Sequence, residues 1–166
     1  MVVLVSEISR YEQATAQINR LIQRISDIEF FQQPSENEWS IAQIVAHLNE
    51  AIIFWLDDIQ ALQSIPDGKW GRNHEHVRRL AAVAPKNIES LTRQIAVEKL
   101  ERLATIVADV LATVTVKQLQ QTAPSYNTNF NNKPLSFIVE HLIVKHIESH
   151  FNQMERHLEK VKLMRI

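Results

Sequence analysis

Histidine is the residue type in this sequence with the clearest potential for chemistry. The chain contains seven histidines and no cysteine, which excludes disulfides, thiolate metal sites and a cysteine nucleophile. His146 and His150 are four residues apart, and residues at this spacing lie one above the other on one face of a helix. Two imidazoles so placed can chelate one divalent ion. His141 precedes His146 by five residues, about 140° around a regular helix, and is expected to miss that ion.

The helix that would carry this pair is expected to bury a face that turns from apolar to polar halfway along. Inward polar groups cost stability unless they are satisfied, and one ion would satisfy both imidazoles at once. His47 offers a third nitrogen, because it lies on the margin of the apolar stripe of an earlier helix. The residues alone leave another interpretation open, since a lone inward histidine is more often an ordinary core residue and such pairs also arise by chance. The face in question carries Leu135, Ile138, Leu142, His146, His150 and Gln153.

Apolar residues recur at steps of three and four along four stretches of the chain, which predicts four long helices. The expected ranges are 7–29, 40–65, about 85–119, and from 134 onward, with a short helical piece at 76–83 and a long loop at 121–133. Ser40 and Gln43 have the spacing of a capping box, which fixes the start of the second helix. Only two glycines occur, too few for the turns of a β protein. The sequence therefore predicts an all-α four-helix bundle, with residues 1–166 forming a single domain.

The composition restricts the possible partners. Of the 166 residues, 45% are apolar and 22% are charged, and the formal net charge is -1, as expected for a globular chain with one sizeable core. This balance provides neither the basic face of a nucleic-acid-binding protein nor a polybasic membrane patch. The apolar run at residues 1–5 is too short for a signal peptide or a membrane span. We therefore expect a cytoplasmic protein that binds neither nucleic acid nor membranes.

Two short motifs around the histidines resemble those of the DinB-like superfamily. Residues 38–48 read EWSIAQIVAHL and are similar to the W-S-x-x-x-[IV]-x-x-H-L opening of that superfamily's second helix. Residues 146–154 read HIESHFNQM and are similar to its late H-x-x-x-H-x-x-Q-[IM] motif. Their order along the chain and their places on the expected helices agree with the resemblance as well.

The resemblance implies a bundle with up-down-down-up topology and a long crossover. It also implies one divalent transition metal, nickel or zinc in the first place, held by His47, His146 and His150. Members with assigned activities include thiol-dependent transferases and isomerases that use mycothiol or bacillithiol, and others are described as metal-dependent hydrolases. Homodimers are common among them, so a homodimer is expected. The sequence departs from the family pattern at Ile147, where an acid often follows the histidine, and at Asn152, where a glycine is frequent, which puts a specific transferred activity in doubt.

Three neutral imidazoles would leave open positions on a divalent ion, as in catalytic metal sites. Such an ion could activate water or a low-molecular-weight thiol against a small-molecule substrate. Glu50 lies about 60° around the helix from His47 and could orient a ligand or act as a base, or simply be a solvated surface residue. Gln153 could form a hydrogen bond near the site or fill a helix interface. The alternative to a metal-dependent transferase or hydrolase is a non-catalytic helical-bundle dimer in which the metal is structural or absent.

Residues in the two irregular segments are candidates for the walls of a substrate pocket, although an ordinary loop role is also open for each. Neither a Ser-His-Asp set, a phosphate-binding loop nor a dinucleotide motif appears in the sequence. The candidates are Trp70, Asn73, His74, Tyr126, Asn127 and Asn129.

Overall fold

The computed structural model describes residues 1–165, and this part of the chain is helical, with no β-strand. The long helices are α1 (Val5–Arg24), α3 (Ile41–Ser64), α6 (Arg93–Ala112) and a last helix made of α8 (Leu135–Phe137), the π-helix η2 (Ile138–Val144) and α9 (Lys145–Leu163). Shorter elements connect them: α2 (Asp27–Phe31), α4 (Val77–Ala82), α5 (Pro85–Ile88), α7 (Val116–Gln120) and the 3₁₀ turn η1 (Thr128–Phe130). None of the described helices is long and apolar enough to cross a membrane.

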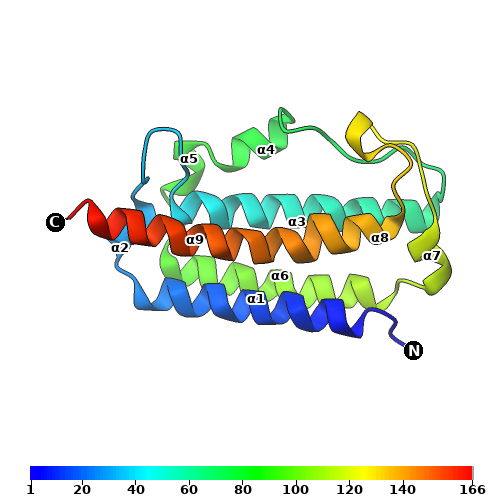
Figure 1. Ribbon diagram of the computed structural model, residues 1–166, viewed down its shortest axis with the longest axis horizontal. Helices are drawn as coiled ribbons and strands as arrows, with labels where there is room; N and C mark the ends of the chain where they lie inside the picture. The colour runs from blue at the N-terminus through cyan, green and yellow to red at the C-terminus, as the bar shows by residue number, and fades with distance from the viewer. Residues whose placement is uncertain (166) are drawn as a thin grey trace.

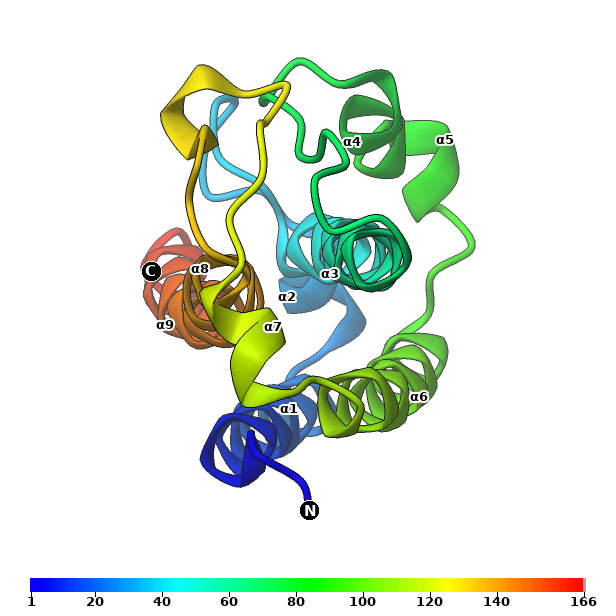
Figure 2. The same ribbon diagram turned by 90° about the vertical axis from the view of Figure 1, so that its right-hand side faces the viewer.

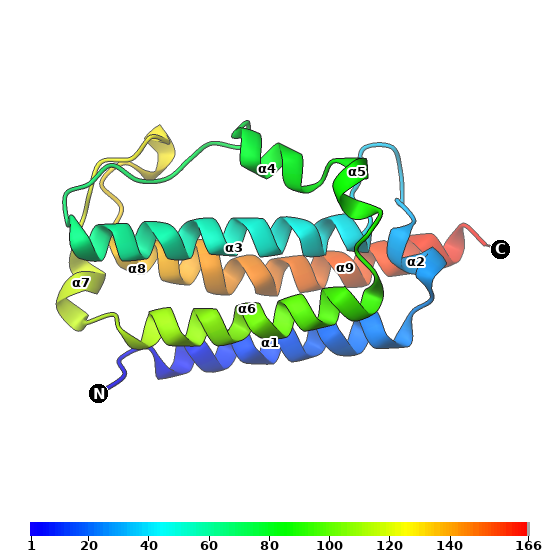
Figure 3. The same ribbon diagram turned by 180° about the vertical axis from the view of Figure 1, so that it is seen from behind.

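The long helices form a four-helix bundle with the expected up-down-down-up topology. Figure 1 shows α3 and α6 running in one direction while α1 and the last helix run in the other. Viewed end-on in Figure 2, α1 and α6 form one layer, and α3 and the last helix form the other. Because α3 and α6 are parallel, the chain between them must return along the whole bundle. This segment, residues 65–92, is called the crossover below, and Figure 3 shows it passing along α3 on the outer side.

Local capping signals decide where the helices begin. Ser40 caps α3, and its side chain and that of Gln43 each bond the other's backbone N–H, so the expected capping box is confirmed. The expected helix over 7–29 is wrong in one respect, because it is interrupted at residues 25 and 26. Ser26 and Glu29 form a second capping box there and start α2. A capped N-terminus with extended backbone at Ser26 is incompatible with one continuous helix.

The expected third helix over 85–119 is also divided into shorter helices. Thr92 caps α6 through the N–H of Ile95, and Thr115 and Gln118 form a capping box that starts α7. The apolar periodicity continues across these breaks because α5, α6 and α7 all pack on the same core. The short helix expected at 76–83 is confirmed as α4, and the long loop expected at 121–133 is confirmed apart from the single turn η1.

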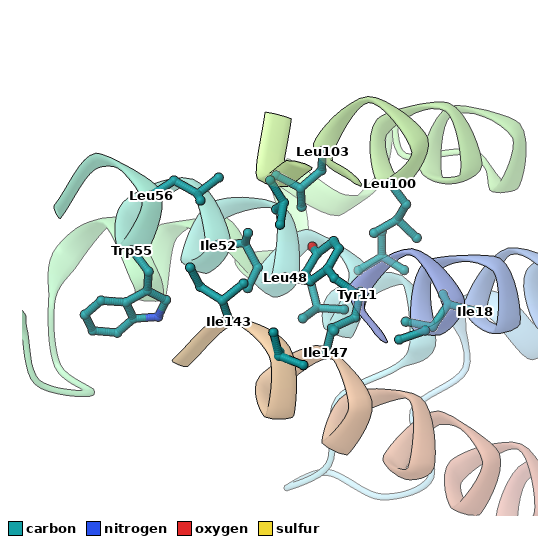
Figure 4. Close-up of a cluster of buried hydrophobic side chains, with 14 of the residues drawn as sticks. Tyr11, Ile18, Leu48, Ile52, Trp55, Leu56, Leu100, Leu103, Ile143 and Ile147 are labelled. Atoms are coloured by element: carbon teal, nitrogen blue, oxygen red, sulfur yellow. The ribbon is translucent and has the colours of Figure 1, made fainter. Parts of the chain in front are cut away.

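The core lies between the two layers of helices and is built from aliphatic side chains of all four. Figure 4 shows these side chains meeting around Tyr11. Each turn of a long helix contributes residues at steps of three or four, which is why the apolar stripes predicted the helices. The labelled residues, all buried, are Tyr11, Ile18, Leu48, Ile52, Trp55, Leu56, Leu100, Leu103, Ile143 and Ile147.

The crossover is fixed to the loop that follows α7, which spans residues 121–134 and is called the late loop below. Trp70 is buried, its indole N–H donates to the carbonyl of Ala123 at 3.2 Å, and its ring stacks on Phe130. Gly71 adopts a φ of 87°, and a Cβ there would lie 2.6 Å from the Ser125 hydroxyl oxygen. Glycine is therefore required at this close approach. Both segments lie over the layer of α3 and α9, on the side away from α1 and α6 (Figure 2).

Candidate metal centre

Three histidines from two helices converge beneath the crossover. His47 comes from the second turn of α3, and His146 and His150 come from successive turns of α9. One ring nitrogen from each lies within 4.8 Å of the other two, and Nε2 of His47 is 3.0 Å from Nε2 of His146. His47 is buried and the other two are half-buried. No other cluster of three potential metal ligands occurs among residues 1–165.

Hydrogen bonds orient two of the three rings. Nδ1 of His146 lies 3.0 Å from the carbonyl oxygen of Leu142, and Nδ1 of His150 lies 2.6 Å from Oε1 of Gln153. Since these oxygens only accept hydrogen bonds, Nδ1 is the protonated nitrogen in both rings. Each Nε2 therefore keeps its lone pair, and this is the tautomer that a metal-binding histidine needs.

His47 differs from the other two rings because no oxygen within residues 1–165 accepts a hydrogen bond from its Nδ1. Its Nδ1 is buried and has no hydrogen-bond partner among the described residues. Its Nε2 faces the lone pair of His146 at 3.0 Å, so in the absence of a cation Nε2 of His47 must be the donor. A cation between the rings would instead bind both lone pairs. Two nitrogens bound to one zinc ion, each about 2.0–2.1 Å away, lie about 3.3 Å apart in a tetrahedral site, so the separation of His47 and His146 fits a divalent ion. The nitrogen of His150 lies within 4.8 Å of both and would complete the site with a small movement of its ring.

The surroundings keep the imidazoles neutral. Burial, followed by the proximity of His146 and His150, lowers the pKa of His47 to about 2. Burial, followed by the neighbouring His150, lowers the pKa of His146 to about 4, and burial lowers the pKa of His150 as well. A neutral imidazole is the form that binds metal. The three rings are therefore in the metal-binding protonation state at neutral pH without any proton having to leave.

The triad forms part of the wall of a cavity of about 300 Å³, large enough for a small molecule. Helix α3 and the last helix provide one side, and the crossover and the late loop provide the other. The side chains outside the triad include three aromatic rings and two arginines. The remaining lining residues are Trp39, Ala51, Trp55, Arg72, Asn73, His74, Arg79, Asn127, Phe130, His141 and Leu142.

Comparison with known proteins gives the family. The family model described as the DinB superfamily matches residues 10–154, which include all three histidines. The chain belongs to the DinB superfamily. Among curated proteins, no sequence matches it.

A solved structure shares this DinB-superfamily fold. YfiT from Bacillus subtilis is described as a probable metal-dependent hydrolase with an unusual four-helix bundle topology. It matches with a TM-score of 0.71 over 93% of this chain and 86% of its own, at 13% sequence identity. At this identity the likeness establishes the bundle topology alone, and the prediction of an up-down-down-up bundle is confirmed.

His141 occupies a place in this DinB-superfamily chain that regular helical geometry did not predict. It is outside the triad, as expected, but it lines the same cavity as His146. His141 lines the cavity because it belongs to the π-helix η2, in which hydrogen bonds join residues five apart. The wider turn brings His141 round toward the face of His146, whereas 3.6 residues per turn would place it well away.

Glu50 and Gln153, the two residues expected to assist catalysis, both lie one contact away from the cavity. Neither is among its lining residues. Glu50 is not a solvated surface residue, because its two oxygens bind the guanidinium of Arg72 at 2.8 and 2.5 Å and its side chain is only 14% exposed. Gln153 holds His150 through the hydrogen bond given above. Both therefore support residues that do line the cavity.

The sequence indicated some of the cavity walls and missed others. Of the loop residues considered as candidates, Asn73, His74 and Asn127 line the cavity, whereas Trp70, Tyr126 and Asn129 do not. The lining residues not anticipated in this DinB-superfamily chain are chiefly Trp39, Arg72, Arg79 and Phe130. Arginine in an irregular segment has no pattern that would distinguish it from a solvated residue. Only the return of the crossover over α3 brings Arg72 and Arg79 to the site.

Proposed function

We propose that this protein is a metalloenzyme that acts on a small molecule, with one divalent transition metal, nickel or zinc, held by His47, His146 and His150. The observation that carries the proposal is the convergence of three neutral imidazoles at the wall of a cavity with room for a substrate. A purely structural site usually closes its coordination with four protein ligands. Here the described residues provide three nitrogens, and the remaining side of the site is the cavity.

When bound, the ion would supply Lewis-acid activation of a water molecule or of a low-molecular-weight thiol. The reaction proposed is accordingly a hydrolysis or a thiol transfer. The description of YfiT as a probable metal-dependent hydrolase supports the first. The cavity lining contains no carboxylate, so the imidazoles of His74 and His141 are the lining groups outside the triad that can accept a proton.

The remaining residues of the site hold the reacting groups in place. Gln153 fixes the ring of His150, and Leu142 fixes that of His146 through its carbonyl. Asn127 donates to the carbonyl of Arg72 at 3.2 Å, which connects the late loop to the crossover across the cavity. Substrate would therefore bind between two layers that the protein fastens together.

The test is to measure the metal content of the purified protein and then its activity. Nickel- and zinc-loaded wild-type protein would be assayed on ester, amide and electrophilic substrates, with and without added thiols, beside His47→Ala. We expect turnover that requires both metal and His47. If chelation removed most of the stability and no substrate reacted, the ion would be structural, and the non-catalytic alternative would replace this proposal. The expected homodimer and cytoplasmic location stay predictions, for sedimentation and fractionation to check.

A further inference from the structure

Two arginines of the crossover line the same cavity but differ in how their charges are balanced. Arg72 is buried, with a side chain only 3% exposed, and it forms a two-pronged ion pair with Glu50. Its guanidinium also lies over the ring of Phe54, 4.1 Å from the centroid. Arg72 is therefore fixed in place with its charge compensated, and it has little capacity left to bind a charged ligand.

Arg79 has no such counter-charge. No carboxylate oxygen lies within 4.0 Å of its guanidinium among residues 1–165. Nη1 donates to the carbonyl of His74 at 3.0 Å, and the guanidinium lies 5.6 Å from the ring centre of Trp39. Burial and the nearby positive charge of Arg72 lower the pKa of Arg79, and the more distant carboxylate of Glu50, already paired with Arg72, offsets this only in part. An arginine remains a cation at neutral pH. An anion bound in the cavity would therefore balance the charge of the Arg79 guanidinium.

The rest of the lining strengthens this preference for an anion. It contains two arginines and five histidines but neither aspartate nor glutamate. Three neutral imidazoles would not offset the charge of a divalent ion, so metal binding would make the cavity more positive still. A concave site of one charge sign, walled by apolar groups, concentrates its field on the ligand. Trp39, Trp55 and Phe130 provide those apolar walls.

Two N–H groups of Arg79 remain available to donate hydrogen bonds to a carboxylate. The only hydrogen bond recorded for its side chain uses Nη1, which leaves Nε and Nη2, two parallel donors on one edge of the guanidinium. This edge matches the two oxygens of a carboxylate. A phosphate can meet the same edge with two of its oxygens, so the experiment below compares phosphate directly with carboxylates.

We propose that the small molecule bound in this cavity is a carboxylate, whose carboxyl group pairs with Arg79 while its organic part lies against the aromatic walls, toward the histidine triad. This inference rests on the proposed function for the role of the bound molecule as substrate or co-substrate. It assigns Arg79 the part of a specificity-determining residue and gives the crossover a binding role.

The experiment compares benzoate with benzamide, which has nearly the same shape and no charge. Binding would be measured by titration calorimetry on metal-free and zinc-loaded protein, with acetate, succinate and inorganic phosphate as further probes. The variants are Arg79→Gln, Arg79→Lys and Arg78→Gln. Arg78 is the matched control, because it is the neighbouring arginine of α4 but is 53% exposed and outside the cavity lining. Its Nε lies 3.8 Å from Glu50, longer than a hydrogen bond, so Glu50 keeps its two bonds to Arg72 when Arg78 is replaced.

We expect Arg79→Gln to weaken benzoate binding about ten- to hundredfold, the usual scale for charge-assisted hydrogen bonds. Arg79→Lys should lose less, Arg78→Gln should bind as the wild type does, and benzamide should bind weakly to every variant. Equal benzoate affinity in wild type and Arg79→Gln would overturn the inference. So would phosphate binding more tightly than every carboxylate, or no carboxylate binding to the wild type at millimolar concentration.

Zinc content separates this inference from the proposed function. Arg79→Gln should bind zinc as the wild type does, since Arg79 is not a ligand, and its melting temperature shows whether the fold is intact. Carboxylate binding that depends on Arg79 in a protein unable to bind metal would contradict the proposed function and leave this inference standing. If zinc binding and turnover were unchanged in Arg79→Gln and carboxylate binding were unchanged too, the inference would be contradicted and the proposed function would stand.

Discussion

The two layers of the bundle both bury polar atoms, but they arrange them differently. On α1, the hydroxyl groups of Tyr11 and Thr15 and the amide oxygen of Asn19 are buried with no partner among the described residues. They lie at four-residue steps along one helix, so their backbone positions are about 6 Å apart, and all three approach from the same helix. In the other layer, His47 faces His146 and His150 across two helices, and their ring nitrogens meet within 4.8 Å.

The difference shows that convergence from separate helices, rather than buried polarity alone, marks the candidate site. Polar groups on one helix approach an ion from one side only, whereas groups from two facing helices approach it from both sides and can surround it. The layer of α1 and α6 otherwise packs aliphatic side chains such as Ile18, Leu100 and Leu103. We therefore expect substitutions in that layer to change stability, and substitutions in the α3 and α9 layer to change metal binding.

Leu100→Ala in α6 should have the largest effect on stability. The side chain is buried in the core, and such truncations cost about 2–5 kcal/mol through lost burial and the cavity left behind. Chemical denaturation measures the loss, with the exposed neighbour Lys99→Ala as control. The metal content per folded molecule should not change. Loss of metal binding in Leu100→Ala at temperatures where it is folded would contradict the division between the layers.

His47→Ala should remove the stabilisation that a bound metal provides. A ligand at 100 times its dissociation constant stabilises the folded state by about 2.7 kcal/mol, and the variant should show no such rise in melting temperature with nickel or zinc. His141→Ala is the control, because His141 lines the cavity outside the triad. An equal loss in both variants would mean that His141 is also a ligand and that the triad is wrongly chosen.

The four long helices and the histidine triad could be predicted from the sequence because the patterns that indicate them are local or periodic. Ser40 and Gln43 fixed the start of α3, and the apolar stripes indicated the four long helices. The spacing of His146 and His150 and the two family motifs indicated the triad. The capping boxes at Ser26 and Thr115 have the same spacing as the one at Ser40, yet the apolar stripes that continue past them suggested unbroken helices.

The rest depends on contacts between distant segments, to which no local pattern corresponds. The π-helix that brings His141 to the cavity interrupts an otherwise ordinary helical periodicity. Arg79 reaches the cavity because the crossover is held in place at two points, by Trp70 against the late loop and by Gln43, which donates to the carbonyl of Val83. The ion pair of Glu50 has no local signal in the sequence, because its partner Arg72 lies 22 residues further along the chain.

Gln153→Leu should weaken metal binding without removing a ligand. The variant loses the acceptor for Nδ1 of His150, and substitutions of such supporting groups typically cost 10- to 100-fold in metal affinity, or about 1.4–2.7 kcal/mol. Competition with a chromophoric chelator measures the change. Asn152→Leu places the same side chain at the exposed neighbouring position and should have no effect. Wild-type affinity in Gln153→Leu would show that the hydrogen bond does not orient His150.

The pH dependence of stability in the metal-free protein tests whether the imidazoles are neutral in the folded state. The pKa values of His47 and His146 are lowered to about 2 and about 4 in the folded state, so below their ordinary value of 6.5 the unfolded chain binds more protons. The free energy of unfolding must then fall as pH falls from about 6.5 toward 4, by up to about 1.4 kcal/mol per pH unit for each buried imidazole. His47→Ala should reduce this slope by one histidine's share. Denaturation midpoints between pH 7 and 4 that fall equally in both proteins would contradict the neutral, buried state of His47.

The central claim is that His47, His146 and His150 bind one divalent ion together. X-ray absorption spectroscopy of the zinc-loaded protein tests this most directly, because it reports the number and type of atoms around the metal. We predict one ion per chain with three imidazole nitrogens about 2.0–2.1 Å away, reduced to two in His47→Ala. A spectrum with fewer than three imidazoles, or one that His47→Ala leaves unchanged, would contradict the claim.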